Sequence, residues 1–488
     1  MTMSAIAIAK TYRQNVARQG ALLFSGYALA QAMSFGRNAL IGHGLAKGDF
    51  GIAATITLIL QVVETLSDLG SDRLIVQDRD GDTPRFMATS HSVLLARGAV
   101  LTALLLALAP VVATFFAIES AMWAFQLAAL TPLIKGFMHL DCRRAQRLLD
   151  NRPQLLVEVL PQAVTLALTL PAIAMSHDYA SVVWLSLVQA FATVAISHVL
   201  AKTPYQLGLD KPVLARQISF GWPILVSALP LIAVYQGDRM IIGRTAGMEQ
   251  LASYTAAFMV TMVPGLIAAK VGHALMLPMF ADLIRQGRHL RSRFTFMVEA
   301  TTLAAALYMA LFLVAGEFLL PLCFGPNYAG LGSVTGWLAA MWAARMIQAV
   351  AGMALMASGS TRPFMVAGVI RALALPVAAW YAVRGAPIAT IAAIGAAAEV
   401  CSLAYVAFRL ERLEPRLGII LASRALFLIP VALAAELVRG ANTGGLALTA
   451  FICAAVLLAV SAIGLTLMPA LRAQVRHSFK TNAGPLAA

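Results

Sequence analysis

Charged side chains are scarce in this sequence. Asp, Glu, Lys and Arg make up 12% of the 488 residues, whereas hydrophobic residues make up 60% and the mean hydropathy is +0.80. Ordinary soluble domains carry roughly a quarter charged residues. The composition therefore excludes an ordinary soluble protein and predicts one that lies within a membrane.

Three further absences narrow the class of protein. The apolar runs are continuous rather than alternating, which excludes a closed β-barrel. The sequence contains no P-loop, so any energy for transport is expected to come from an ion gradient or from the substrate gradient. Cysteine is rare, and its four positions lie too far apart to predict a disulfide framework: Cys142, Cys323, Cys401 and Cys453.

Apolar stretches long enough to cross hydrocarbon as helices recur along the whole chain. We predict an all-α, polytopic membrane protein with about 14 transmembrane helices, arranged as two six-helix bundles plus two C-terminal helices. The predicted domains are 1–210, 211–410, and 411–488 with its cytoplasmic tail. The predicted spans are 20–43, 50–76, 87–117, 121–141, 154–175, 180–200, 218–243, 251–280, 295–320, 332–357, 364–384, 386–408, 418–438 and 445–468.

Basic residues are distributed unevenly between the two sets of loops. With the N-terminus inside, the outer loops hold only Lys47, Arg244, Arg384 and Arg439, and the inner segments hold many more. Because short cytoplasmic loops retain Lys and Arg, both termini are predicted to be cytoplasmic. The net charge of +14 then reflects cations that face anionic lipid headgroups rather than nucleic acid.

Two segments in different halves of the chain share a pattern. "FGRNALIGHGLAKGDFGIAA" and "GDRMIIGRTAGMEQLASYTAA" each place an Arg deep in a helix, Arg37 or Arg239, and continue to a Gly and a short outer turn. The pattern predicts a parallel two-fold repeat that pairs spans 1–6 with spans 7–12. Transporters built from such halves place the substrate path between them. Chance similarity between two membrane hairpins is the alternative interpretation.

Several motifs occur in a recognisable order. "GHGLAKGDFGIAATITLILQVVETLSDLGSDRLIVQ" contains a turn with Phe50 and Gly51, and then an acid, Ser-Asp-x-Gly and a final Gln. "RLLDNRPQLLVEVLPQ" carries Glu158, and "GDRMIIGRTAG", "PLCFGPNYAG" and "GMALMASGSTRP" follow. At these residues the chain resembles the polysaccharide repeat-unit transporters, or oligosaccharide flippases, of the multidrug/oligosaccharidyl-lipid/polysaccharide superfamily. It departs from that family at Asp72 and Arg73 and in the polar "MHLDCRRAQRLL".

The resemblance implies movement of undecaprenyl-pyrophosphate-linked oligosaccharide across the bacterial cytoplasmic membrane, for exopolysaccharide, capsule or O-antigen synthesis. It implies alternating access between two bundles, without catalytic residues, a metal or a cofactor. The expected partners are the lipid-linked substrate and membrane lipids, with a polysaccharide polymerase and glycosyltransferases as further candidates. No nucleic acid partner is expected.

Basic residues inside the spans are candidates for substrate binding. A charge at the bilayer centre costs at least about 2.5 kcal/mol, so such residues are expected to face a wet interior. Arginine binds phosphate oxygens with a planar fork and suits a pyrophosphate. A structural ion pair with a neighbouring helix is the alternative for each. The candidates are Arg37, Arg97, Lys270, Arg345 and Arg239, with Lys135 as a weaker one.

Acidic residues are candidates for ion coupling. Glu64, Asp68 and Asp72 recur at intervals of four within a predicted span, so they are expected to share one helical face. Like charges so placed repel, and at least one of them is expected to be protonated near neutral pH. We predict a proton- or cation-coupling role for Glu64 and Asp68. The alternative is that the acids pair with Arg37, Arg73 or Arg97, and this alternative is favoured for Asp72.

Two other functions stay open on the sequence alone. An ion-coupled drug or metabolite antiporter of the same superfamily would need a net acidic cavity for cationic drugs, whereas the isolated deep charges here are mainly basic. A membrane-embedded enzyme of glycan assembly would need acids or a His in its outer loops, and those loops are short. The flippase is therefore the preferred hypothesis.

Overall fold

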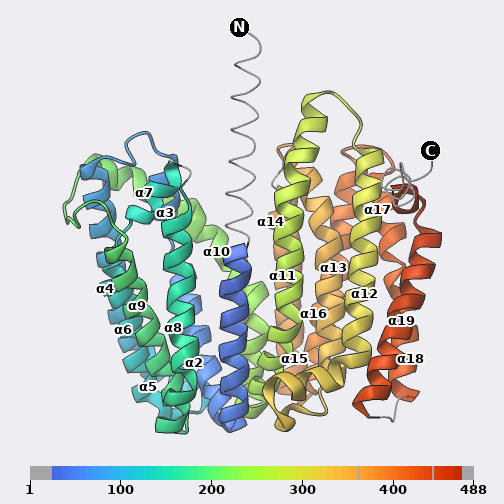
Figure 1. The fold of residues 1–488 in the computed structure, drawn as a ribbon, viewed down its shortest axis with the longest axis horizontal. Helices are drawn as coiled ribbons and strands as arrows, with labels where there is room; N and C mark the ends of the chain where they lie inside the picture. The colour runs from blue at the N-terminus through green and yellow to red at the C-terminus, as the bar shows by residue number, and fades with distance from the viewer. Residues whose placement is uncertain (1–24, 149, 361, 442–444, 475–488) are drawn as a thin grey trace, which may run out of the picture. The chain divides into compact units, whose positions relative to one another are not determined.

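The computed structural model describes residues 25–148, 150–360, 362–441 and 445–474, and helix is the only regular structure in these ranges (Figure 1). The predicted cytoplasmic termini, including Lys10 and Lys480, lie outside the described residues. After a helix over 25–44, the elements are α2 (Lys47–Leu66), α3 (Ser71–Gln77), α4 (Pro84–Phe116), η1 (Glu119–Ala121), α5 (Met122–Ala128), α6 (Leu130–Gly136), α7 (Asp141–Arg147), α8 (Arg152–Ser176), α9 (Ala180–Val199), α10 (Lys211–Thr245), α11 (Met248–Arg285), α12 (Arg291–Phe324), η2 (Pro326–Tyr328), α13 (Gly332–Ala357), α14 (Arg362–Ala372), α15 (Ala374–Val383), α16 (Ile388–Glu411), α17 (Leu417–Ala425), α18 (Leu428–Ala441) and α19 (Leu446–Leu467).

The described residues contain 12 helical stretches long and apolar enough to cross a membrane. The prediction of a multi-pass, all-α membrane protein is therefore confirmed. The other two predicted spans correspond to the helix over 25–44 and to the segment 121–141, which does not form one helix.

The predicted span 121–141 is divided between α5 and α6, and helix α6 ends at Gly136 rather than at residue 141. Pro132 has no backbone N–H to donate to the preceding turn, so the helical ladder is interrupted before it. The hydroxyl of Thr102 on α4 donates to the carbonyl oxygen of Ala129 at 2.7 Å. A side chain of a neighbouring helix therefore satisfies an acceptor at the interruption.

The predicted span 50–76 is also broken, at the sequence Ser-Asp-Leu-Gly. Gly70 has a φ of +62°, in the left-handed region that favours glycine. The carboxylate of Asp68 accepts the N–H of Gly70 at 2.9 Å, and the hydroxyl of Ser67 donates to the carbonyl oxygen of Glu64 at 3.0 Å. Glu64, Asp68 and Asp72 therefore do not share a continuous helical face, and that prediction is wrong.

The chain forms two compact units. Unit 1 comprises residues 1–232 and 247–252, and unit 2 comprises 233–246 and 253–488. Helices α10 and α11 each contribute to both units. The predicted bundle boundary at residue 210 lies between α9 and α10, whereas unit 1 continues through the first part of α10. The three predicted domains and the two-fold repeat stay predictions.

Unit 1 depends on close approaches between its helices. Helix α8 packs on α9, α4 on α6, and α3 on α7 (Figure 1). A Cβ atom at Gly51 would lie 2.1 Å from the carbonyl oxygen of Met248, and one at Gly98 would lie 2.5 Å from that of Pro132. Any side chain at either glycine would force the two backbones apart, which gives Gly51 of the predicted turn a packing role.

The segment that joins α9 to α10 is held against α7 by a buried carboxylate. Asp141 accepts the N–H of Lys202 at 2.8 Å and the hydroxyl of Thr203 at 2.9 Å, and it also binds Arg144 at 2.6 Å. Burial raises the pKa of Asp141, but these donors outweigh the burial and hold the pKa below its usual value.

Two histidines reinforce this contact. His139 donates its Nε2 proton to the carbonyl oxygen of Thr203 at 3.0 Å, and its Nδ1 accepts the N–H of Asp141 at 3.1 Å. On α4, His91 contacts the carbonyl oxygen of Gln206 through Nδ1 at 3.1 Å and accepts the N–H of Leu140 at Nε2 at 3.1 Å. Each ring thus uses both nitrogens in a neutral tautomer that the backbone partners select.

Helix α13 forms the centre of unit 2. It packs against both α12 and α16, and most of its side chains are buried. Its small residues permit this, since Gly336 faces Leu313 of α12 and Gly352 faces Phe364 of α14. Helices α17, α18 and α19 pack on α12, so the two predicted C-terminal helices belong to unit 2.

Candidate functional site

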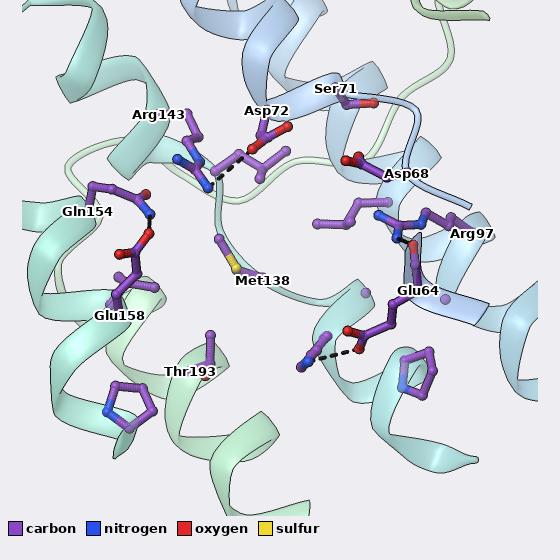
Figure 2. A pocket seen from close by; sticks show the side chains of 18 of the residues that line it. Glu64, Asp68, Ser71, Asp72, Arg97, Met138, Arg143, Gln154, Glu158 and Thr193 are labelled. Carbon is purple, nitrogen blue, oxygen red and sulfur yellow. Dashed lines mark hydrogen bonds and ion pairs between the residues drawn. The ribbon is translucent and has the colours of Figure 1, made fainter. Parts of the chain in front are cut away.

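A cavity of about 480 Å³ lies within unit 1. Its charged lining residues between α2 and α7, here called the ionic wall, are Glu64, Asp68, Asp72, Arg97, Lys135 and Arg143. The polar lining residues from the helix over 25–44, α8 and α9, here called the amide wall, are Tyr27, Gln31, Gln154, Glu158, Gln162, Gln189 and Thr193. Figure 2 shows Gln154 and Glu158 on one side of the cavity and Glu64 and Arg97 on the other.

The acids of the ionic wall are bound by basic residues. Lys135 of α6 lies 2.8 Å from the carboxylate of Glu64 at the end of α2. The side chains of Lys135 and Glu64 remain 40% and 32% exposed, and both line the cavity, so the pair is partly hydrated. The predicted partners for Glu64 were arginines, and its observed partner is the weaker candidate Lys135.

The other two acids have partners on different elements. The carboxylate of Asp68 lies 3.2 Å from the guanidinium of Arg73 of α3, and Arg73 was one of its predicted partners. Asp72 lies 3.2 Å from Arg143 of α7 instead of pairing with Arg37, Arg73 or Arg97. The favoured interpretation of Asp72 as an ion-paired residue is therefore correct, although its partner was not among those predicted.

Arg97 is bound by neutral groups. Its Nε donates to the hydroxyl of Ser67 at 3.0 Å, and its Nη2 donates to the carbonyl oxygen of Glu64 at 2.8 Å. Both acceptors lie at the C-terminal end of α2, where the helix dipole favours a cation. None of the ion pairs between described residues includes Arg97, so its charge is available to a ligand in the cavity.

The amide wall is organised along α8. The amide nitrogen of Gln154 donates to Glu158 at 2.6 Å. On α9, Gln189 accepts a hydrogen bond from Arg37 at 2.7 Å, so Arg37, which is not a lining residue, contacts one that is. Amide and hydroxyl groups both donate and accept hydrogen bonds, which suits them to bind sugar hydroxyls.

The charges of the cavity nearly cancel. Four carboxylates line it, those of Glu64, Asp68, Asp72 and Glu158, together with three cations, Arg97, Lys135 and Arg143. The sequence indicated mainly basic deep charges, and this cavity instead contains one more carboxylate than cations. Arg97 is the predicted substrate-binding cation that lines it, whereas Lys270 lies on α11 with its side chain outside the described part of the structure.

Arg345 lies in unit 2 and is bound by protein groups. It is hydrogen-bonded through Nε to Glu399, and Arg371 lies 3.6 Å from the same carboxylate. The side chains of Arg345 and Glu399 are 10% and 1% exposed. The guanidinium also lies 4.9 Å from the ring centroid of Trp342. These contacts favour a structural role, and the assignment of Arg345 to substrate binding stays a prediction.

Arg239 is also enclosed within unit 2. It donates to the carbonyl oxygen of Tyr235 at 2.6 Å and lies 4.6 Å from the ring centroid of Phe258. The neighbouring Asp238 accepts the hydroxyl of Tyr254 at 2.5 Å. The cavity lined by Asp238, Arg345, Arg371 and Glu399 measures only about 40 Å³, which is room for about one water and not for a sugar.

Sequence reasoning missed most of the amide wall. Gln154, Glu158 and Gln162 recur at intervals of four residues, and this spacing was as visible in the sequence as that of the three acids from Glu64 to Asp72. Arg143 was not among the predicted site residues. Among the described residues, no group of three or more His, Cys, Asp or Glu side chains is placed to hold a metal ion.

Comparison with known proteins bears on both the family and the fold. Residues 45–332, more than half of the chain, match the family described as "Polysaccharide biosynthesis protein". No curated protein sequence matches. Among solved structures, the lipid II flippase MurJ in an inward closed conformation is similar, with a TM-score of 0.70 at 11% identity over 91% of this chain and 99% of that chain.

Two structures of multidrug resistance MATE family transporters of the MOP superfamily are also similar. The inward-facing one has a TM-score of 0.60 at 15% identity, over 79% of this chain and 95% of that chain. The outward-facing one has a TM-score of 0.51 at 15% identity, over 82% and 96%. At these identities the likeness shows the fold, and it confirms the predicted architecture.

Proposed function

The chain belongs to the polysaccharide biosynthesis protein family, and from this premise we propose that it moves lipid-linked oligosaccharide repeat units across the bacterial cytoplasmic membrane. The carrier is proposed to be undecaprenyl pyrophosphate. The protein would act by alternating access, with both termini in the cytoplasm and without a covalent step. The exported units would serve exopolysaccharide, capsule or O-antigen synthesis.

The observation that carries this proposal is the two-sided cavity of unit 1. Arg97 offers a guanidinium whose own contacts are neutral, so it can bind a phosphate oxygen without first breaking an ion pair. The amide wall offers hydroxyl and amide groups to the glycan. The apolar tail of the carrier needs no polar site and can remain in lipid.

One observation favours an ion-coupled antiporter for drugs or metabolites as a second candidate. The cavity contains one more carboxylate than cations, and cationic compounds bind where carboxylates predominate. The MATE transporters share the fold. Against this candidate, three of the four carboxylates are bound by basic residues, which leaves Glu158 as the acid without such a partner among the described ion pairs.

Reconstituted vesicles test the proposal. The protein is placed in liposomes with a fluorescent polyprenyl-pyrophosphate oligosaccharide, and movement of the probe is followed with a quencher that acts on one leaflet. We expect the wild type to move the probe and Arg97→Gln to slow it about tenfold, as the loss of one charge-assisted contact to phosphate predicts.

Arg85→Gln is the matched control, because Arg85 is an exposed residue of the same helix outside the cavity lining. Movement of a cationic dye but not of the glycolipid would establish the antiporter instead. Movement of the glycolipid at the wild-type rate by Arg97→Gln would exclude Arg97 as a phosphate ligand.

A further inference from the structure

Helix α8 presents a polar stripe to the cavity of unit 1. Gln154, Glu158 and Gln162 lie four residues apart, so they occupy one face of the helix, and all three line the cavity. Figure 2 shows Gln154 and Glu158 together on the side opposite Glu64. The stripe therefore forms a surface that a ligand in the cavity would contact.

The orientation of the Gln154 amide is fixed by its neighbour. An ionised carboxylate can only accept hydrogen bonds, so the NH₂ group of Gln154 must face Glu158, at 2.6 Å. The amide oxygen is then directed away from Glu158. Gln154 is 3% exposed, and this oxygen is buried without a hydrogen-bond partner.

Unpartnered acceptors predominate on the stripe. The amide oxygen of Gln162 is also buried without a hydrogen-bond partner. A buried acceptor left unpaired costs about 1–3 kcal/mol, and a ligand that brings donors removes this cost. Hydroxyl and N–H groups are such donors, and sugars carry many of them. A carboxylate carries none when ionised.

Charge leads to the same conclusion. Glu158 occurs in none of the ion pairs between described residues, whereas Lys135 and Arg143 are bound to Glu64 and Asp72. The remaining cation of the lining, Arg97, is assigned to the pyrophosphate under the proposed function. A second carboxylate brought to α8 would lie beside Glu158 and be repelled by it. The stripe is thus suited to a ligand that donates hydrogen bonds and has no negative charge.

We propose that the stripe of Gln154, Glu158 and Gln162 is a sugar subsite that accepts a neutral or amino sugar and excludes a uronic acid. This inference rests on the proposed function, and it adds the chemical class of the saccharide. Glu158 is the residue that determines specificity in it. Gln154 and Gln162 bind the hydroxyl or N–H donors of the sugar.

Two glycolipid probes that differ at one carbon test the inference. Both have the same polyprenyl-pyrophosphate carrier, and the sugar has a hydroxymethyl group at C6 in one and a carboxylate there in the other. We expect wild-type vesicles to prefer the hexose probe by about tenfold, because like charges in a partly hydrated site repel. In Glu158→Gln, faster movement of the uronate probe should reduce the preference to nearly equal rates.

Glu119→Gln serves as the control for charge, since Glu119 is exposed in η1 and outside the cavity lining. Gln154→Leu should raise the half-saturating concentration of the hexose probe. It should leave the preference for the hexose probe over the uronate probe unchanged. The amount of folded protein is checked by size-exclusion chromatography in detergent.

The outcomes separate the two proposals. If the wild type moves neither probe, the proposed function is wrong, and the subsite falls with it. If the wild type moves both probes and Glu158→Gln leaves their ratio unchanged, the subsite is wrong and the proposed function stands. A wild type that prefers the uronate probe would also overturn the subsite.

Discussion

The amine of Lys135 lies 2.8 Å from the carboxylate of Glu64, and this contact joins α6 to α2 beside the cavity of unit 1. The contact bears on the predicted ion-coupling role of Glu64. The two opposite charges compensate each other at the cavity wall. We therefore expect the two residues to act as a unit.

The first prediction tests this unit. Glu64→Gln and Lys135→Gln should each slow glycolipid transport, because each leaves one unpaired charge at the cavity. The double variant should be no slower than either single variant, since it removes both charges. Transport in vesicles, with and without a pH gradient, is the measurement. Defects that add in the double variant would contradict the paired role. A loss of the response to the gradient in Glu64→Gln alone would instead support the coupling role.

A second prediction concerns the buried carboxylate of unit 2. Glu399→Gln should destabilise the protein by about 3–5 kcal/mol, because Arg345 and Arg371 would remain largely enclosed without their common buried anion. Thermal unfolding in detergent measures the effect.

The control for this second prediction is Glu436→Gln, which breaks the ion pair between Glu436 and Arg439. The side chain of Glu436 is 50% exposed. The effect of the control should be at most about 1 kcal/mol. If the two variants unfold at the same temperature, the buried pair does not stabilise unit 2.

The third prediction is a dependence of stability on pH. Burial lowers the pKa of His139 below its ordinary value, so the folded protein binds the proton more weakly than the unfolded chain does. The stability that neutral His139 contributes is fully present above the pKa of the histidine in the unfolded chain, about 6.5. It is lost as the pH falls through the lower pKa of His139 in the folded protein. The contacts explain the direction, because a proton on Nδ1 would face the N–H of Asp141.

Melting temperatures between about pH 7.5 and about pH 5 measure this loss. The loss should be smaller in His139→Gln, which keeps a donor and an acceptor but does not titrate. It should be unchanged in His43→Gln, because the His43 side chain is exposed and its ring contacts the carbonyl oxygen of Ala39 within its own helix. A wild-type melting temperature that is constant over this range would refute the prediction.

The fourth prediction concerns a thiol. Burial raises the pKa of Cys142 to about 11, so very little thiolate exists near neutral pH. A variant that retains only Cys142 should therefore resist a maleimide reagent in its folded state and react fully after denaturation. Rapid labelling of the folded protein would show that Cys142 is accessible.

The architecture could be predicted from the sequence because the hydrocarbon core imposes a length on every span. Breaks within spans were harder to predict, although one had a local signal. The run Ser67-Asp68-Leu69-Gly70 contains a side-chain acceptor two residues before a glycine, a typical turn signature. The apolar length of the span concealed it, and the three acids were consequently placed on one helix.

The partners of the buried charges could not be predicted for a different reason. Glu64 and Lys135 are 71 positions apart, and Arg345 and Glu399 are 54 apart. Which helices become neighbours is decided by packing, as at Gly98, where α4 touches the backbone of α6. Nothing in the local sequence of Glu64 encodes that contact. The predicted partners, Arg37, Arg73 and Arg97, therefore did not include Lys135 or Arg143.

The division of α10 and α11 between the units has a consequence for biosynthesis. The chain leaves unit 1 after residue 232, returns to it at 247 and leaves again after 252. Gly51 meets the carbonyl oxygen of Met248, so unit 1 lacks one of its packing surfaces until the ribosome has completed α10. The first unit cannot mature before synthesis of the second has begun, and no single proteolytic cut can separate the two as intact fragments.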